Sequence, residues 1–254
     1  MARLLLLALV LALPAAAQSD DLLSQGRRAL DAATLDGSVD ALQGARAALQ
    51  LAAAGDGPAG WATYYTALAD FRLSYALWGN DPDRASEHAA LGADALADLR
   101  RRADSDDLRA EAAALQSGLL GARIGLDPSL GMQLGQASQQ AMAEAARLAP
   151  GNPRVQFFQA ATLLNTPPEW GGDPERAVEL LASAVATFEA AGDPGDPAAP
   201  TWGHADAAAW LGLAHLMRGD AKAARGPIET AERLDPNSTF VRFKLRPWLD
   251  SLGE

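Results

Sequence analysis

The chain has 254 residues, no cysteine and a formal net charge of −11 at pH 7, because 32 acidic side chains outnumber 21 lysines and arginines. The lack of cysteine excludes disulfides, thiolate catalysis and the zinc sites that need cysteine. The negative charge argues against nucleic acid and anionic lipid surfaces as partners, because both repel an acidic protein.

Residues 1–17 have the pattern of a secretory signal peptide. Arg3 supplies the positive start, a leucine-rich apolar run follows, and Ala15 and Ala17 form a small-residue cleavage signature. The apolar run is about ten residues long, whereas a membrane-spanning helix needs about 20. We therefore expect residues 18–254 to be a soluble mature chain without a membrane span, in the periplasm or secreted, and without a lipid anchor on cysteine.

The mature chain shows helical periodicity and no sustained strand pattern, which predicts an all-α protein. Each expected second helix carries a triplet of residues: a small residue, an apolar residue four positions later, and a small residue three positions after that. The small residues let two helices cross closely. The five triplets are Ala41, Ala45 and Ala48; Ala85, Ala89 and Gly92; Ser138, Met142 and Ala145; Ala177, Leu181 and Ala184; and Ala224, Ile228 and Ala231. The expected first helices span residues 20–34, 60–79, 106–124 and 153–165, and the fifth opens the segment 205–238.

This order predicts an α-solenoid of about five helical hairpins in one domain, residues 18–254. Successive triplets lie further apart than the 34 residues of a minimal helical repeat, so we expect irregular units with lengthened helices or loops. The two clearest units are residues 153–190 and 205–238.

Residues 205–238 carry the most complete pattern: a Leu-Gly pair, a small residue, a large apolar residue four positions later and a closing proline. The small residues allow the two helices to approach, and the large apolar residue fills the groove between them. The positions with this structural role are Leu211, Gly212, Ala224, Ile228, Ala231 and Pro236.

This pattern resembles the tetratricopeptide repeat, although the usual tyrosine is His215. The resemblance implies stacked helical hairpins whose first helices line a concave groove that binds partners. By the same resemblance, the groove positions of the last unit are Asp206, Ala209, Leu213, Leu216 and Met217. All of them except Asp206 are apolar. Over residues 150–250 the chain is also loosely similar to the accessory T-components of tripartite ATP-independent periplasmic transporters.

Residues 239–252 are expected to form a final capping helix that covers the array. Its apolar residues share one helical stripe, with Pro247 expected to kink the helix or shift its start. They are Val241, Leu245, Trp248 and Leu252.

Two long loops combine Pro, Gly and Trp, and they are candidate binding elements because loops longer than a turn requires often carry function. Either the tryptophans present flat apolar surfaces while the glycines let a ligand approach, or each Trp folds back to seal its own hairpin. The residues concerned are Trp170, Gly171 and Gly172 in the first loop, and Trp202, Gly203 and His204 in the second.

An aromatic stripe, Tyr64, Phe71, Tyr75 and Trp78, follows helical spacing in the expected helix 60–79. It is either core or the lining of an aromatic groove. In the second case Tyr64 and Tyr75 would contact the ligand.

The sequence contains no catalytic or metal-binding set. His204 and His215 are about 16 Å apart along one helix, too far to share a metal ion, and His88 belongs to another hairpin. There is no HExxH, GxSxG or GxxxxGK[ST] motif. We therefore expect no enzyme activity, no metal and no cofactor.

The favoured function is a periplasmic or secreted scaffold that binds an unidentified protein partner of the cell envelope. The alternative is a transport accessory that presents or shelters a small, partly hydrophobic ligand, since the long loops and the aromatic stripe would permit it.

Overall fold

A computed structural model describes residues 15–54, 59–191 and 198–252, and these residues form helices and no strands. The α-helices are α1 (Ala15–Asp36), α2 (Val39–Ala53), α3 (Ala59–Leu77), α4 (Pro82–Arg102), α5 (Asp106–Leu126), α6 (Gly131–Leu148), α7 (Pro153–Asn165), α8 (Pro174–Ala190), α9 (His204–Met217), α10 (Ala221–Leu234) and α11 (Arg246–Leu252). Three short segments, η1 (Pro128–Leu130), η2 (Pro168–Trp170) and η3 (Val241–Leu245), complete them. Most of the expected signal peptide, residues 1–14, lies outside the described residues.

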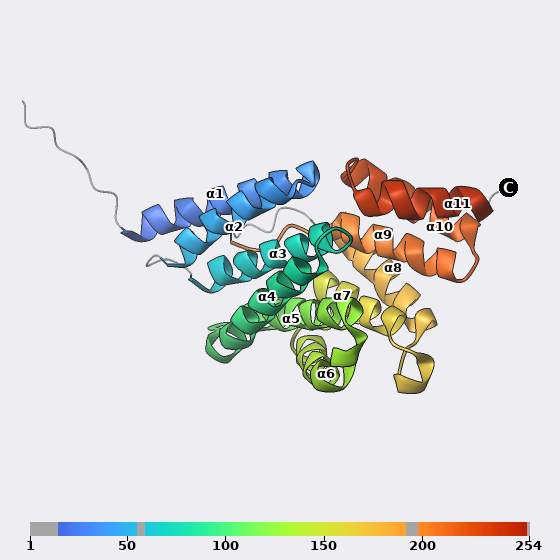
Figure 1. Ribbon diagram of the computed structural model, residues 1–254, viewed down its shortest axis with the longest axis horizontal. Helices are drawn as coiled ribbons and strands as arrows, with labels where there is room; N and C mark the ends of the chain where they lie inside the picture. Colours follow the sequence, from blue (N-terminus) through green and yellow to red (C-terminus); the bar gives the residue numbers. More distant parts are fainter. Residues whose placement is uncertain (1–14, 55–58, 192–197, 253–254) are drawn as a thin grey trace, which may run out of the picture.

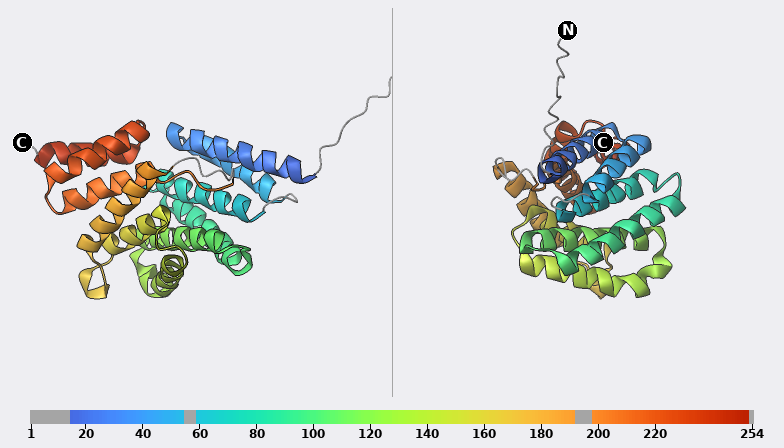
Figure 2. Two further views of the ribbon diagram at one scale, coloured as in Figure 1. Left: turned by 180° about the vertical axis from the view of Figure 1, so that it is seen from behind. Right: turned by 90° about the vertical axis from the view of Figure 1, so that its left-hand side faces the viewer.

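The helices pack in consecutive antiparallel pairs, which confirms the prediction of an all-α solenoid (Figure 1). Each odd-numbered helix also contacts the next odd-numbered one, from α1 through α3, α5 and α7 to α9. These helices form an inner layer, and α2, α4, α6, α8 and α10 lie outside it (Figure 2). The first helices of the hairpins therefore line the concave side.

Side-chain caps fix most helix starts. Each capping side chain accepts a hydrogen bond from a backbone N–H two or three residues later, which satisfies a donor that has no partner inside the helix. The caps are Ser38, Asp81, Ser105, Asn152, Asp173 and Asp220. Proline follows the cap in α4, α7 and α8, where its missing N–H is harmless.

The last hairpin shows the close crossing that its sequence pattern predicts. A Cβ atom placed on Gly212 would lie 2.5 Å from Cγ1 of Ile228, so no larger residue fits without movement. Ala224 and Ile228 are fully buried, and Ala231 is 1% exposed.

The first hairpin has a different register from the predicted one. In α2 the buried residues are Leu42, Ala45 and Leu49, together with Ala52, whereas the predicted Ala41 and Ala48 are only half-buried. The larger apolar side chains take the core positions because they bury more apolar area.

Residues 239–252 form one helical segment with a wider π turn at η3, immediately before Pro247. Proline lacks an N–H and its ring crowds the carbonyl four residues earlier, which accounts for the wider turn. The buried stripe is Val241, Leu245 and Leu249. The predicted stripe was therefore wrong at its end, since Trp248 is half-buried and Leu252 is 43% exposed.

The superhelix curls until its two ends meet. The side chain of Asn237, in the connection after α10, donates a hydrogen bond of 2.9 Å to the carbonyl oxygen of Leu35 near the end of α1. In Figure 1 this contact joins the blue and red ends at the top of the molecule, with α5 and α6 at the opposite side.

Candidate functional site

Residues 198–203, which we call the strap, cross the inner layer before α9 begins. Arg27 of α1 donates from Nη2 to the carbonyl oxygen of Ala199 at 2.9 Å. Tyr65 of α3 donates from its hydroxyl to the carbonyl oxygen of Ala198 at 3.2 Å. The strap therefore occupies part of the concave side itself.

Trp202 anchors the end of the strap inside the protein. Its Nε1 donates to the hydroxyl of Tyr64 at 3.1 Å, and its ring packs edge to face on Phe158, with centroids 6.0 Å apart. The guanidinium of Arg72 lies 5.3 Å from its ring centroid. This arrangement differs from both predicted ones, because Trp202 seals the inner layer rather than its own hairpin or an open rim.

The strap is tied to a buried polar network around Glu111, which is 2% exposed. Tyr64 donates to Oε2 of Glu111 at 2.9 Å, and Arg154 and Asn152 both donate to Oε1 at 2.7 Å. Burial and the neighbouring carboxylate raise the pKa of the Tyr64 phenol. Tyr64 is fully buried, so the expectation that it lines a binding surface is corrected: it is a core residue.

One face of α5 carries glycines at Gly118, Gly121 and Gly125, spaced three and four residues apart and therefore on one side of the helix. The ring of Phe158, from α7, lies over Gly118, 2.4 Å from the position of an added Cβ. The ring of Trp78, which follows α3, lies over Gly125 at 2.7 Å. Between the two rings, a Cβ on Gly121 would meet no atom within 4 Å. The backbone of α5 is therefore open at Gly121.

Tyr75 lies next to Trp78, whose ring covers Gly125 on this face. Its ring stacks on Trp78 with centroids 5.4 Å apart and planes at 29°, and it contacts Phe71 at 4.9 Å. The side chain is 45% exposed, yet desolvation by the surrounding chain raises its pKa to about 12. Tyr75 is therefore accessible to solvent on one side and covered by protein on the other. We call the space bordered by Tyr75, Trp78 and Gly121 the central hollow.

α9 faces α3 across the same space. Both oxygens of Asp206 accept from the guanidinium of Arg72, at 2.6 and 2.7 Å. Leu213 and Met217 follow Asp206 at seven and eleven positions, on the same helical face, and Met217 is 50% exposed. Of the five groove positions expected on α9, these three lie on that face.

The other two expected groove positions are core. Ala209 is 4% and Leu216 is 2% exposed, and both pack against α10 and the C-terminal segment. The expectation that they line the groove is therefore corrected.

The charges near the hollow are mainly negative. Partial desolvation raises the pKa of Asp31, an exposed residue near the end of α1, while Arg27 and Arg72 oppose the shift. Burial also raises the pKa of Asp235, and the charge of Asp206 adds to that increase. Among the described residues around this space, two arginines, Arg27 and Arg72, thus stand near three aspartates, Asp31, Asp206 and Asp235.

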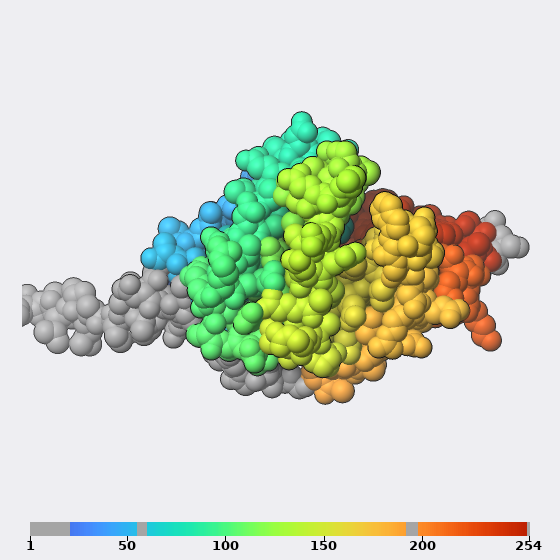
Figure 3. Space-filling model, turned by 90° about the horizontal axis from the view of Figure 1, so that it is seen from below, coloured from blue at the N-terminus to red at the C-terminus, as the bar shows by residue number. Residues whose placement is uncertain are grey.

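Two lobes of the surface each carry an exposed apolar side chain. Figure 3 shows a cavity between the light-green lobe around η1 and the start of α6 and the gold lobe of the α7–α8 loop, with the dark red C-terminal helices behind it. Met132 in the first lobe is 99% exposed, and Trp170 in the second is 74% exposed.

The three loop glycines serve the chain's own geometry. Gly171 and Gly203 have φ angles of 96° and 113°, which other residues rarely adopt. A Cβ on Gly172 would lie 1.8 Å from the carbonyl oxygen of Thr166, and one on Gly203 would lie 2.8 Å from Phe188. Gly203 is buried, so it offers no surface to a ligand, contrary to the expectation for that loop.

The histidines are dispersed. His204 stacks on Phe188 with centroids 5.6 Å apart, and burial lowers its pKa. His215 also has a pKa lowered by burial, and His88 pairs with buried Asp70 at 2.7 Å. The described residues contain no group of three side chains placed to hold a metal ion. They also contain no helix that is long and apolar enough to cross a membrane.

The fold and the hollow together define an all-α solenoid with a partly enclosed inner face. No family model matches the chain, and no curated protein matches it. Among solved structures it is similar to the HusA haemophore from Porphyromonas gingivalis, with a TM-score of 0.63 and 25% sequence identity over 76% of this chain and 91% of HusA. A helical repeat architecture thus fits the comparisons, whereas none of them assigns the chain to the tetratricopeptide or transporter T-component families.

Proposed function

We propose that this protein is a secreted, non-enzymatic binding protein that holds a flat, mainly apolar ligand in the central hollow. The observation that carries the proposal is the open backbone at Gly121 between the rings of Trp78 and Phe158. The similar structure is a haemophore, that is, a haem carrier, and haem is therefore the first ligand to test. Secretion rests on the signal pattern of residues 1–17.

Aromatic rings and glycine suit such a ligand for separate reasons. The partly exposed ring of Tyr75 offers a face for offset stacking. A glycine in a helix lets a ligand reach van der Waals distance of the backbone, because no Cβ intervenes. A concave, mostly apolar surface with a few polar groups is the usual form of a small-molecule site.

The strap favours this small-ligand function over the peptide scaffold. It covers the inner face where α1, α3 and α7 would otherwise contact an extended peptide. A long peptide would have to displace four hydrogen bonds made by Arg27, Tyr65, Tyr64 and Arg154.

Electrostatics set the orientation of a ligand such as haem. Asp31 and Asp235 near the hollow would repel carboxylate groups. The propionates of haem would therefore remain at the surface opening while the ring enters.

The test is an absorbance titration of residues 18–254 with haem. We expect a saturable spectral change with one haem per chain and quenching of tryptophan fluorescence, since Trp78 borders the hollow. A linear response without saturation, equal to that of an unrelated acidic helical protein, would show that the hollow does not bind haem.

A protein scaffold is the second candidate, favoured by the exposed side chains of Trp170 and Met132. It predicts that crosslinking in the native envelope captures a reproducible partner at these lobes, and that Trp170→Ala weakens the capture. Native mass spectrometry that finds a bound small molecule, with no partner captured, would reject the scaffold.

A further inference from the structure

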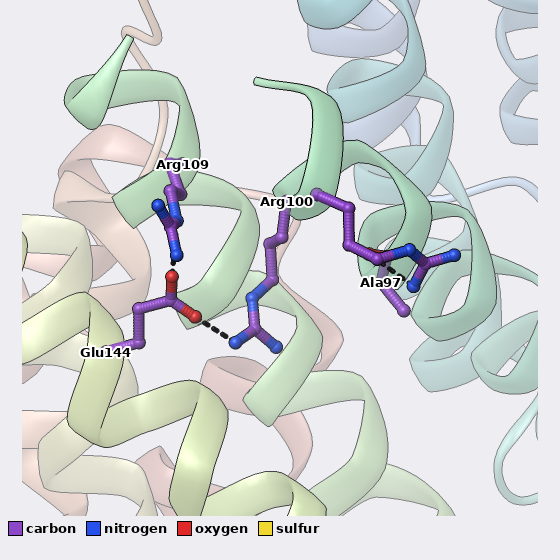
Figure 4. A pocket seen from close by; sticks show the side chains of 5 residues that line it. Ala97, Arg100, Arg109 and Glu144 are labelled. Carbon is purple, nitrogen blue, oxygen red and sulfur yellow. Dashed lines mark hydrogen bonds and ion pairs between the residues drawn. The ribbon is translucent and has the colours of Figure 1, made fainter. Parts of the chain in front are cut away.

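A second concave site lies on the other side of α5, where α4, α5 and α6 meet. It is an open pocket of about 250 Å³ lined by Ala97, Arg100, Arg101, Arg109 and Glu144. Figure 4 shows Arg100 and Arg109 reaching toward the carboxylate of Glu144 from opposite sides. Two positive side chains, Arg100 and Arg109, therefore pair with one negative side chain, while Arg101 also lines the pocket, in a chain whose net charge is −11.

The arginines of this pocket keep donors that no protein group uses. Arg109 is 44% exposed, and its Nε pairs with Glu144. It makes no other side-chain hydrogen bond within the described residues, so both of its Nη groups remain available. Arg101, at 70% exposure, pairs only with its own helix, through Asp98 and the carbonyl of Ala97.

Arg100 adds a buried donor. Its Nη1 donates to Gln116 at 2.5 Å and its Nη2 to Glu144, but its Nε is buried and has no hydrogen-bond partner. A buried N–H without a partner is unfavourable and calls for a water or an ion nearby. This unpaired N–H belongs to a side chain that lines the pocket.

We propose that this pocket binds an oxyanion group, a phosphate or a carboxylate, on Arg109 and Arg100. The planar guanidinium matches both groups by paired N–H donors. Glu144 sits between the two arginines and satisfies them when no ligand is present, so it competes with the anion. Arg101 can leave Asp98 and complete the site.

The pocket is independent of the central hollow. Arg109 and Gly121 are twelve residues apart on α5, which places them about 18 Å apart along the helix axis. The proposal of an oxyanion site is therefore independent of the proposed carrier function. Haem titration of the pocket variants distinguishes the two.

The experiment is isothermal titration calorimetry of residues 18–254 with sodium phosphate and, in a separate arm, sodium acetate, at ionic strength matched with chloride. The variants are Arg109→Gln and Glu144→Gln. Arg176→Gln is the control, because Arg176 is an exposed arginine on α8 in a pair with Glu179. The two arms show whether the site prefers phosphate or carboxylate.

We expect saturable binding of one anion to the wild type, at least tenfold weaker binding to Arg109→Gln and tighter binding to Glu144→Gln, with Arg176→Gln unchanged. The proposal is overturned if the wild type shows no saturable heat with either anion, or if Arg109→Gln binds as well as the wild type. Should Glu144→Gln fail to fold, the comparison of Arg109→Gln with Arg176→Gln still decides.

Discussion

Glycine residues mark the places where helices of this protein approach most closely. Gly118 lies under Phe158, Gly125 under Trp78 and Gly212 under Ile228. At each of the three, an added Cβ would lie less than 3 Å from an atom of the side chain above it. Only Gly212 could be predicted from the sequence, because Ile228 belongs to the same hairpin and the same short pattern. The rings over the other two come from neighbouring hairpins, about 40 or more residues away.

Gly212→Ala tests the close crossing in the last hairpin. The added methyl group would overlap Ile228, and we expect a loss of about 1–3 kcal/mol in the free energy of unfolding. Gly135→Ala is the control, since its added Cβ meets no atom within 4 Å. Alanine is the better helix former, so the control should gain about 0.5–1 kcal/mol. Urea denaturation measures both, and a change of the same sign in both variants would refute the crossing.

The two loop tryptophans should contribute differently to the free energy of unfolding. Trp202 is half-buried against Phe158 and donates to Tyr64, so Trp202→Ala should lower the free energy of unfolding by about 3 kcal/mol. Trp170 is 74% exposed, and Trp170→Ala should change it by less than about 0.5 kcal/mol. Equal melting temperatures for the two variants would contradict the role of Trp202 in the inner layer.

Asp31 should make stability depend on pH. Its side chain is exposed, but desolvation by the neighbouring chain raises its pKa above 3.8, so the folded protein holds the proton more tightly than the unfolded chain. Its contribution therefore favours folding at low pH and is lost as the pH rises through the folded-state pKa. Asn cannot ionise, and we expect Asp31→Asn to be more stable than the wild type at pH 7.

The advantage of Asp31→Asn should shrink as the pH falls toward the ordinary aspartate pKa of about 4. Urea denaturation of both proteins at neutral and acidic pH measures it. An advantage that grows on acidification, or a variant that is less stable at pH 7, would show that the carboxylate is stabilised by its surroundings.

At the scale of helices, capping residues and small-residue triplets predict the hairpins well. Asp81, Asp173 and Asp220 begin the second helices of three hairpins, as local patterns lead one to expect. The register of α2 was not predictable from the triplet, because several positions in an alanine-rich helix fit it and only packing selects among them. The strap could not be predicted either, since Ala198 and Ala199 bond to Tyr65 and Arg27, more than 130 residues earlier.

Glu111 connects α3, α5 and α7 through one buried carboxylate. Glu111→Gln removes the charge that balances Arg154, which is 11% exposed. We expect the free energy of unfolding to fall by about 3–5 kcal/mol, as for other buried pairs that lose one partner. Glu179→Gln on α8 removes an exposed partner and should cost less than about 1 kcal/mol. Chemical denaturation compares the two, and similar losses would mean that the Glu111 network contributes little.

At the scale of the whole molecule, the ends of the solenoid meet at Leu35 and Asn237, and the inner helices line its concave side. Closure depends on the curvature accumulated over five hairpins, which no local pattern reveals. The aromatic stripe indicated the right helix but left its role open. In the structure the residues of this stripe have different roles: Tyr64 lies in the core and Tyr75 lies at the hollow.

The most direct test of the carrier function is the dissociation constant of haem for Gly121→Leu relative to the wild type. Leucine at Gly121 would extend into the open space beside this position, because a Cβ there meets no atom within 4 Å, and Gly135→Leu on α6 is the control, since a Cβ at Gly135 also meets no atom within 4 Å. We predict that Gly121→Leu binds haem at least tenfold more weakly while Gly135→Leu binds it as the wild type does. Equal affinity of all three proteins would contradict a ligand in the central hollow.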